Sequence, residues 1–303
     1  MEARHVTRRE AIARTAIAGL LLPVMGAARG LGIGEAAGHD GAPQAGPSMT
    51  LGLAGYSLRK LSIDAAIAAM TEMGIKSVSV FRVHVPILLG TPEECRVAAE
   101  KFRSAGIAIA STGVVTLTNS EGTMRRAFEC GKAAGLSTMA ASYKEPPDRE
   151  TLLLTERFVR EYDIRLAFHN HGPEDKIFPS PYDVWDAVQP YDPRMGLCID
   201  VGHSFRAGVD PVEAILKCRS RLYDAHIKDT LVGAGVKKDI PVGLGFGKLD
   251  IRAILEALVQ VGFPYQAGLE DEMETADPIP GIAQSFGYMR GIVAALPARK
   301  PSA

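Results

Sequence analysis

Residues 165–172 read RLAFHNHG, a short and mostly apolar run that ends in two histidines one residue apart. Side chains alternate between the two faces of a β-strand, so His169 and His171 point the same way if the strand continues through both. Two inward-facing imidazoles are costly to bury unless they have partners. The run therefore indicates a strand whose C-terminal end carries groups for binding or chemistry.

Three later apolar runs end in ionisable residues as well. Met195–Ile199 is followed by Asp200 and His203, Leu222–Ala225 by His226 and Lys228, and Gln266–Leu269 by Glu270. In a parallel barrel the active site is built at the C-terminal ends of the strands. We expect these side chains to meet at one face of such a barrel.

From Met49 onward, strand-like runs alternate with longer amphipathic runs, the pattern of a parallel sheet with helical crossovers. The predicted strands are Thr50–Tyr56, Ser77–Val83, Ala108–Val115, Thr138–Ser142, Arg165–His169, Met195–Asp200, Leu222–Ile227 and Gln266–Glu270. The predicted helices are Ser62–Met73, Pro92–Ala105, Gly122–Ala134, Arg149–Tyr162, Tyr182–Gln189, Val212–Ser220, Ile251–Val261 and Ala276–Leu296. Eight such units in about 250 residues predict a single (β/α)₈ TIM barrel, of class α/β.

The alternative is an open doubly wound sheet, which usually carries a glycine-rich phosphate loop after its first strand. Here the first strand runs into Gly55–Leu58 without that motif. The glycine-rich segment Gly243–Lys248 is followed by Leu249 rather than Ser or Thr, and no strand immediately precedes it. It is not a phosphate loop, and we interpret it as a mobile loop after the seventh strand, near the site.

The composition is that of a soluble globular domain, with 303 residues, 47% hydrophobic residues and a formal net charge of −1. A nearly neutral chain has no global attraction for nucleic acid or for anionic membranes. Cys95, Cys130, Cys198 and Cys218 form no CxxC pair and are interpreted as buried thiols. A bridge between Cys95 and Cys130 is left open.

The N-terminus differs from the rest of the chain. Arg8 and Arg9 precede the uncharged stretch Thr15–Ala28, after which come small residues and a segment rich in Gly, Ala and Pro. This order is typical of a secretory signal, and the arginine pair indicates the twin-arginine route. An amphipathic N-terminal helix is the alternative. We therefore predict a signal peptide and linker over residues 1–47, a barrel over 48–297, a tail over 298–303, and a periplasmic or otherwise exported enzyme.

The rim residues together predict a metal site. A single histidine at a strand end is more often a hydrogen-bonded structural residue than a ligand. His169, Asp200, His226 and Glu270 combine two imidazoles with two carboxylates, which are ligands that suit a divalent ion.

The four motifs HNHG (169–172), IDVGH (199–203), AHIKD (225–229) and GLE (268–270) resemble those of the xylose isomerase-like TIM-barrel superfamily. The resemblance extends from about Met49 to Leu296. The superfamily includes sugar phosphate isomerases and epimerases, inosose dehydratases and the endonuclease IV branch. In its sugar-active members one divalent ion (Mn, Co, Mg or Zn) is held by residues that match His169, Asp200, His226 and Glu270.

The resemblance implies an isomerase or epimerase that removes a proton next to a metal-bound carbonyl, through an enediolate. His169, however, stands where many members have a glutamate that serves as one of two acid/base groups. A metal-dependent lyase, dehydratase or hydratase acting on a keto-sugar or inosose is therefore the alternative. An abasic-site endonuclease is less favoured, because the chain has only seven histidines and its trinuclear site needs many ligands. A non-catalytic sugar-binding barrel is also less favoured, because Asp200, His226 and Glu270 are retained.

The expected roles follow from these groups. Glu270 or His171 would take the proton and Lys228 would donate one. An ion pair of Lys228 with Asp229 or Glu270 is the alternative. The resemblance implies that His203, with Arg206, contacts the substrate hydroxyls, and His84 and Asn170 are the other expected substrate-binding residues. The expected partner is a small sugar or keto-sugar, with no nucleic acid and no membrane beyond the signal segment; a homo-oligomer is compatible with the sequence.

Overall fold

A computed structural model describes residues 49–297. The predicted signal peptide and linker over 1–47 and the predicted tail over 298–303 lie outside the described residues. Between residues 49 and 297, no helix is both long enough and apolar enough to cross a membrane.

The described part of the chain alternates strands and helices, as predicted. The strands are β1 Thr50–Ala54, β2 Ser77–Val80, β3 Ala108–Thr112, β4 Val115–Leu117, β5 Thr138–Tyr143, β6 Arg165–His169, β7 Met195–Asp200, β8 Leu222–Ile227, β9 Asp229–Thr230, β10 Pro241–Val242 and β11 Gln266–Leu269. The α-helices are α1 Ile63–Glu72, α2 Pro92–Ser104, α3 Glu121–Ala133, α4 Arg149–Tyr162, α5 Pro181–Val188, α6 Val201–Arg206, α7 Pro211–Cys218, α8 Ile251–Gln260 and α9 Ile279–Ala295. Short 3₁₀ turns cover Gly55–Leu58 and Arg219–Arg221.

Most helices begin where a side chain can accept hydrogen bonds from the first turn. Thr91 and Ser180 each form a capping box with the acidic residue three positions later, and each is followed by a proline. Asp148 and Asp250 accept from the backbone in the same manner at the starts of α4 and α8. Each cap is worth ~0.5–2 kcal/mol to its helix. The sequence therefore marks these helix starts locally.

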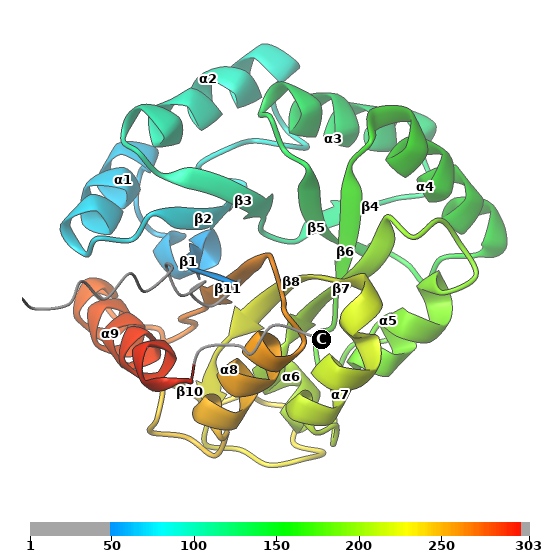
Figure 1. The fold of residues 1–303 in the computed structure, drawn as a ribbon. Coiled ribbons are helices and arrows are strands. Elements are labelled where there is room, and N and C mark those ends of the chain that lie inside the picture. The colour runs from blue at the N-terminus through cyan, green and yellow to red at the C-terminus, as the bar shows by residue number, and fades with distance from the viewer. Residues whose placement is uncertain (1–48, 298–303) are drawn as a thin grey trace, which may run out of the picture. The chain divides into compact units, whose positions relative to one another are not determined.

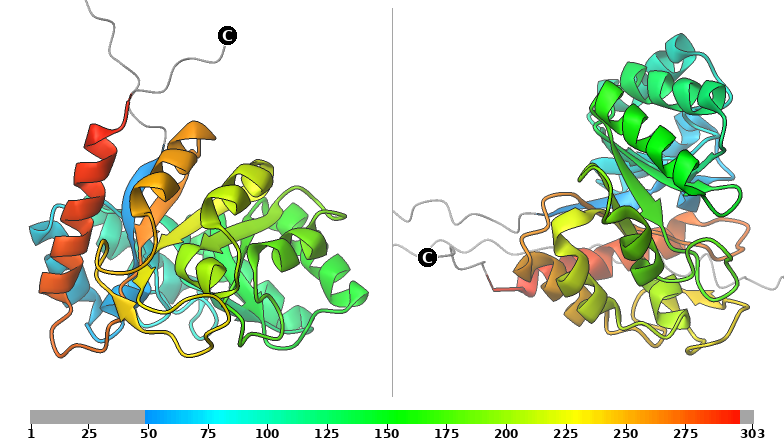
Figure 2. Two further views of the ribbon diagram at one scale, coloured as in Figure 1. Left: turned by 90° about the horizontal axis from the view of Figure 1, so that it is seen from below. Right: turned by 90° about the vertical axis from the view of Figure 1, so that its right-hand side faces the viewer.

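Nine strands form one curved parallel sheet in the order β3-β2-β1-β11-β8-β7-β6-β5-β4 (Figure 1). β1 pairs with β11, so the first and last strands of the sequence are neighbours. The helices lie on the outer side of the curved sheet (Figure 2). The predicted α/β barrel is confirmed as a TIM-barrel-like fold with a nearly closed sheet.

The predicted strand Ala108–Val115 is two strands, β3 and β4, which form the two edges of the sheet. β3 pairs with β2 and β4 pairs with β5. Between them the Thr112 hydroxyl donates to the Ala140 carbonyl at 3.2 Å, and the Gly113 N–H donates to Val80 at 2.7 Å. A side chain at Gly113 would meet the Phe81 ring at 3.0 Å. Glycine here lets the chain pass from one neighbour to the other.

A helix that was not predicted follows β7 directly. The carboxylate of Asp200, the last residue of β7, accepts from the His203 N–H at 2.8 Å and so caps α6. The sequence Val201–Arg206 is too short for its periodicity to signal a helix. The cap places His203 and Arg206 beside Asp200.

The glycine-rich segment Gly243–Lys248 comes after the small antiparallel pair β9–β10. It is tied down by the buried carboxylate of Asp229, which accepts from the N–H groups of Gly245 at 3.0 Å and Gly247 at 2.9 Å. All four cysteines are buried and free in the structure.

Candidate metal centre

The four predicted ligands come from strands that are neighbours in the sheet. His169 ends β6, Asp200 ends β7, His226 lies in β8, and Glu270 follows β11. One ligand atom from each lies within 4.8 Å of those of the other three. Because parallel strands end at the same edge, residues spread over about a hundred positions converge here.

The contacts among these four are short, and the side chains are almost fully buried. His169 Nε2 lies 3.1 Å from His226 Nδ1 and 3.4 Å from Asp200 Oδ2. His226 Nδ1 lies 3.3 Å from Glu270 Oε2. Exposed fractions are 3% for His169, 0% for Asp200, 1% for His226 and 7% for Glu270.

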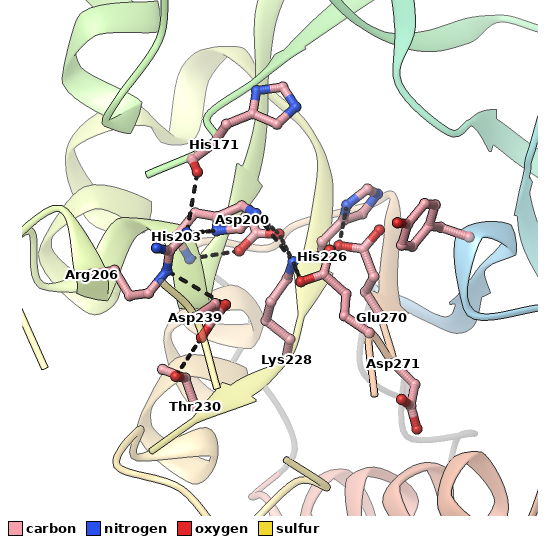
Figure 3. A network of polar contacts seen from close by, with 12 residues as sticks. His171, Asp200, His203, Arg206, His226, Lys228, Thr230, Asp239, Glu270 and Asp271 are labelled. Atoms are coloured by element: carbon pink, nitrogen blue, oxygen red, sulfur yellow. Dashed lines mark hydrogen bonds and ion pairs between the residues drawn. The ribbon is translucent and has the colours of Figure 1, made fainter. Parts of the chain in front are cut away.

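Lys228 lies in the middle of the carboxylates (Figure 3). Its ammonium is 2.8 Å from Asp200 Oδ2, 2.8 Å from Glu270 Oε2 and 3.0 Å from Glu272 Oε2. Lys228 is only 2% exposed, so these ion pairs are shielded from water. The ion pair with Glu270 that the sequence left open as an alternative is present, together with one to Asp200.

The charges of this cluster support one another. Burial, the largest effect, opposes ionisation of Lys228, yet Asp200, Glu270 and Glu272 hold its pKa well above its usual range. Burial likewise opposes ionisation of Glu270, but His226 and Lys228 hold its pKa far below the ordinary value. Burial, the largest effect, raises the pKa of Asp200, but the contacts with His203 and with the Lys228 ammonium bring it well below its ordinary value. Asp200 and Glu270 are therefore anionic at neutral pH.

The two ligand imidazoles differ in protonation. Burial, followed by the nearby His171, lowers the pKa of His169 to about 4, so this imidazole is neutral. Burial acts on His226 in the same direction, but its contacts with Cys198 and with the Glu270 carboxylate raise its pKa well above the usual value. His226 must therefore give up a proton to become a metal ligand.

His203 presents a hydrogen-bond donor toward the same centre. Arg206, which can only donate, lies 2.8 Å from His203 Nδ1, so Nδ1 is the acceptor. Burial lowers the pKa of His203 well below its usual value, and the neutral ring then carries its proton on Nε2. Nε2 is 3.4 Å from the Lys228 ammonium. Among the described residues, the one carboxylate oxygen that Nε2 approaches is Asp200 Oδ2, at 3.9 Å. That distance is too long for a hydrogen bond.

Arg206 has its donors directed to protein groups. It is 0% exposed and contacts both carboxylate oxygens of Glu174, at 3.0 and 2.7 Å, and the Lys237 carbonyl at 2.6 Å. Asp239 Oδ2 is 3.5 Å from its Nε. These contacts join α6 to the loop that follows β6 and to the loop between β9 and β10. Substrate contact by Arg206 stays a prediction.

Asn170, His171 and His84 lie in different surroundings. Asn170 exchanges hydrogen bonds with the Asp200 backbone, at 3.0 and 3.2 Å, and so fixes that ligand. His171 lies beside His169, with ring centroids 4.5 Å apart, and its Nδ1 is 2.9 Å from Asp175. His84 packs against Phe102, and its Nε2 is 3.3 Å from the Leu61 carbonyl. Substrate contact by Asn170 and His84 stays a prediction.

Two members of the centre were not singled out from the sequence. Glu272 is not among the predicted site residues, and Cys198 was interpreted only as a buried thiol. Cys198 lies two residues before Asp200 on β7, and that spacing puts both side chains on one face of the strand. The position of Cys198 could therefore be predicted from its spacing. Glu272 lies in the loop after β11, so the direction of its side chain could not.

The donor set fits a divalent metal. Two imidazole nitrogens and two carboxylate oxygens are ligands used by Zn²⁺ and by harder ions such as Mn²⁺. Asp200 Oδ2 is completely buried, and its close partners are the Lys228 ammonium at 2.8 Å and His169 Nε2 at 3.4 Å. An ion bound to the quartet would satisfy that oxygen.

The chain is similar to solved barrels. An IOLI protein with a bound zinc atom is 15% identical, with a TM-score of 0.65, over 81% of this chain and 98% of that one. An L-ribulose 3-epimerase is 12% identical, with a TM-score of 0.63, over 81% and 95%. The probable 3-DHS dehydratase AsbF from Bacillus anthracis is 11% identical, with a TM-score of 0.63, over 80% and 99%. At these identities the likeness shows the fold alone.

No curated protein sequence is significantly similar to the chain. The family model described as xylose isomerase-like TIM barrel matches residues 55–292, which is most of the chain. The match includes all four candidate ligands and Lys228. The chain therefore belongs to the xylose isomerase-like TIM barrel family.

Proposed function

We propose that this protein is a divalent-metal-dependent enzyme that moves a proton next to the carbonyl of a small sugar or keto-sugar. The observation that carries the proposal is the buried quartet of His169, Asp200, His226 and Glu270, whose ligand atoms lie within 4.8 Å of one another. A bound divalent ion supplies a Lewis acid that polarises a carbonyl and makes the neighbouring C–H more acidic.

The chain's own groups can move the proton. Glu270 is anionic and can accept it, while the Lys228 ammonium, 2.8 Å away, can donate to an oxygen of the substrate. The N–H at Nε2 of His203 can donate to a substrate hydroxyl. Positioned acid–base groups of this kind typically contribute ~10²–10⁴-fold to the rate.

A lyase, dehydratase or hydratase is the second candidate, and the neutral imidazole of His169 favours it. An epimerase needs proton acceptors on both sides of one carbon. Asp200 and Glu270 both contact the same Lys228 ammonium, and His169 stands where many family members have the second acid/base glutamate. One-sided proton removal followed by loss of a leaving group suits this arrangement better than symmetric epimerisation. The fold relatives include both an epimerase and a probable dehydratase.

The test is an assay of purified protein loaded with Mn²⁺, and of the same protein with chelator, on free ketoses, keto-sugars and inososes in D₂O. Isomerase or epimerase action introduces deuterium at the carbon beside the carbonyl, and lyase action yields an unsaturated product. Glu270→Gln should abolish either reaction. Equal activity with Mn²⁺ and with chelator would refute metal dependence.

Metal binding is tested separately from turnover. Asp200→Asn and His169→Ala should each weaken Mn²⁺ binding in calorimetric titration, because each removes a ligand. Elemental analysis should find about one ion per chain at this centre. A content near three would favour the endonuclease alternative instead.

A further inference from the structure

A second set of metal-binding side chains lies directly beneath the quartet. The sulfur of Cys198 and one nitrogen each from His169 and His226 lie within 4.8 Å of one another. Cys198 is 1% exposed and is the register partner of His169 in the β6–β7 ladder. It shares the inward face of β7 with Asp200 and lies one layer deeper in the barrel.

The two imidazoles have a nitrogen to spare on each ring. His169 Nε2 and His226 Nδ1 make the contacts to Asp200 and Glu270. Their other nitrogens, His169 Nδ1 and His226 Nε2, are buried without a hydrogen-bond partner among the described residues. A buried polar atom left unpaired costs ~1–3 kcal/mol. A ligand that used these nitrogens would remove that cost.

A buried carboxylate stands next to the thiol. Asp224 is the register partner of Cys198 in the β7–β8 ladder and is 0% exposed. Its Oδ2 has no hydrogen-bond partner among residues 49–297. It would offset part of the charge of a cation held at this depth.

We propose that Cys198, His169 and His226 form an inner cation position that takes a thiophilic divalent ion such as Zn²⁺ or Cd²⁺. One sulfur and two imidazole nitrogens make a softer donor set than the outer quartet. The separations allow a common ion at bond lengths of about 2.0–2.3 Å after small side-chain rotations. On binding, the Cys198 thiol and the protonated His226 imidazole each lose a proton to solvent, one sulfur–metal bond and two nitrogen–metal bonds form, and no oxidation state changes.

The inner position and the outer quartet exclude each other. A neutral imidazole has a single nitrogen with a free lone pair, so it ligates one ion at a time. A thiophilic ion bound to Cys198 therefore withdraws His169 and His226 from Asp200 and Glu270. Zn²⁺ or Cd²⁺ should compete with Mn²⁺, and the competition should depend on Cys198.

The experiment is a Cd²⁺ titration of the full-length protein, followed by the near-ultraviolet thiolate-to-cadmium absorption band, with Mn²⁺ release read by electron paramagnetic resonance. The wild type should develop the band and release Mn²⁺. Cys198→Ser should abolish the band and weaken Cd²⁺ binding by at least the ~10–100-fold typical of losing an outer partner of a metal ligand. Cys198→Ala repeats the test, and circular dichroism checks that both variants fold.

Cys218→Ser, which removes a buried thiol from α7, is the matched control and should leave the band unchanged. Asp200→Asn should keep the band while losing Mn²⁺ binding. The inner position is refuted if no band forms in the wild type, or if it persists at full strength in Cys198→Ser. A band without Mn²⁺ binding would instead count against the proposed function and leave the inner position standing.

Discussion

The Lys228 ammonium lies between carboxylates that a divalent ion would also use, at 2.8 Å from both Asp200 Oδ2 and Glu270 Oε2. Two cations cannot share these oxygens at full strength, because their charges repel at such distances. Glu272, 3.0 Å from the ammonium and outside the quartet, offers Lys228 a partner to keep when an ion is bound. Lys228 thus acts as the internal counter-ion of the metal-free centre.

This role predicts a large effect of Lys228→Met. The substitution leaves three buried or half-buried carboxylates without their ammonium, so the metal-free protein should lose about 3–5 kcal/mol of unfolding free energy. Addition of Mn²⁺ should restore part of that loss, because the ion supplies the missing positive charge. Urea unfolding with and without Mn²⁺ measures both effects.

The matched control is Lys176→Met, at an exposed position in the loop after β6. It should change the unfolding free energy by no more than ~0.5 kcal/mol. If metal-free Lys228→Met were as stable as the wild type, the charge balance described for the centre would be wrong.

At the scale of elements, Asp229 connects the end of β8 to the segment that follows β10. Its carboxylate accepts from the N–H groups of Thr230, Gly245, Gly247 and Leu249, at 2.9 to 3.2 Å. A Cβ at Gly247 would lie 2.0 Å from Asp229 Oδ1, so glycine alone lets the backbone come this close. The glycine-rich run is therefore shaped around a side chain of this protein.

Asp229→Ala should free this segment. It leaves the four N–H groups without an acceptor, and we expect the unfolding free energy to fall on the order of 3 kcal/mol. Limited proteolysis should then cut within residues 231–249 faster than in the wild type. Asp229→Asn keeps one acceptor oxygen and should lose less. Equal proteolysis of all three proteins would contradict the anchoring.

A second connection between elements should govern stability in acid. Asp192, which precedes β7, lies 2.8 Å from Arg160 Nε on α4 and 3.1 Å from Arg194 Nη1. Burial, the largest effect, raises the pKa of Asp192, but hydrogen bonds from the Arg194 backbone and from Arg160 bring it below the ordinary value of 3.8. A depressed pKa stabilises the fold above the ordinary value, and that contribution is lost as the pH falls through the folded-state pKa.

Asp192→Asn should therefore lower the unfolding free energy by about 2 kcal/mol at pH 7, and the difference from the wild type should narrow below pH 3.8. Chemical unfolding across this pH range measures the difference. Asp186→Asn, at an exposed position on α5, is the control and should match the wild type throughout. A constant difference at every pH would show that the ionisation of Asp192 does not matter.

At the scale of the whole molecule, the quartet draws on β6, β7, β8 and the end of β11, so an ion bound there would hold a large part of the barrel together. Mn²⁺ at about 100 times its Kd should stabilise the protein by ~2.7 kcal/mol. For a chain of this size each kcal/mol shifts the Tm by roughly 2–4 °C. Thermal unfolding with Mn²⁺ and then with excess chelator measures the shift, which Asp200→Asn should lack. Export by the twin-arginine route stays a prediction from residues 1–47.

The barrel could be predicted because each strand and helix has its own local sequence pattern. Arg165–His169 and Met195–Asp200 have the predicted bounds, since apolar runs of strand length are bounded by turn residues. The break at Gly113 could not be predicted, because it depends on which strands lie on either side of it. The helix α6 was not predicted for a similar reason, because its N-cap, Asp200, is also the last residue of β7.

The sequence by itself determined the order of strands and helices and which residues stand at the strand ends, because both follow from side-chain periodicity and turn residues. Only the tertiary structure decided that Lys228 lies between Asp200 and Glu270 and that Arg206 pairs with Glu174. It also decided that Cys198 lies close to His169 and His226. Those relations are distances between strands far apart in sequence, and closure of the sheet sets them.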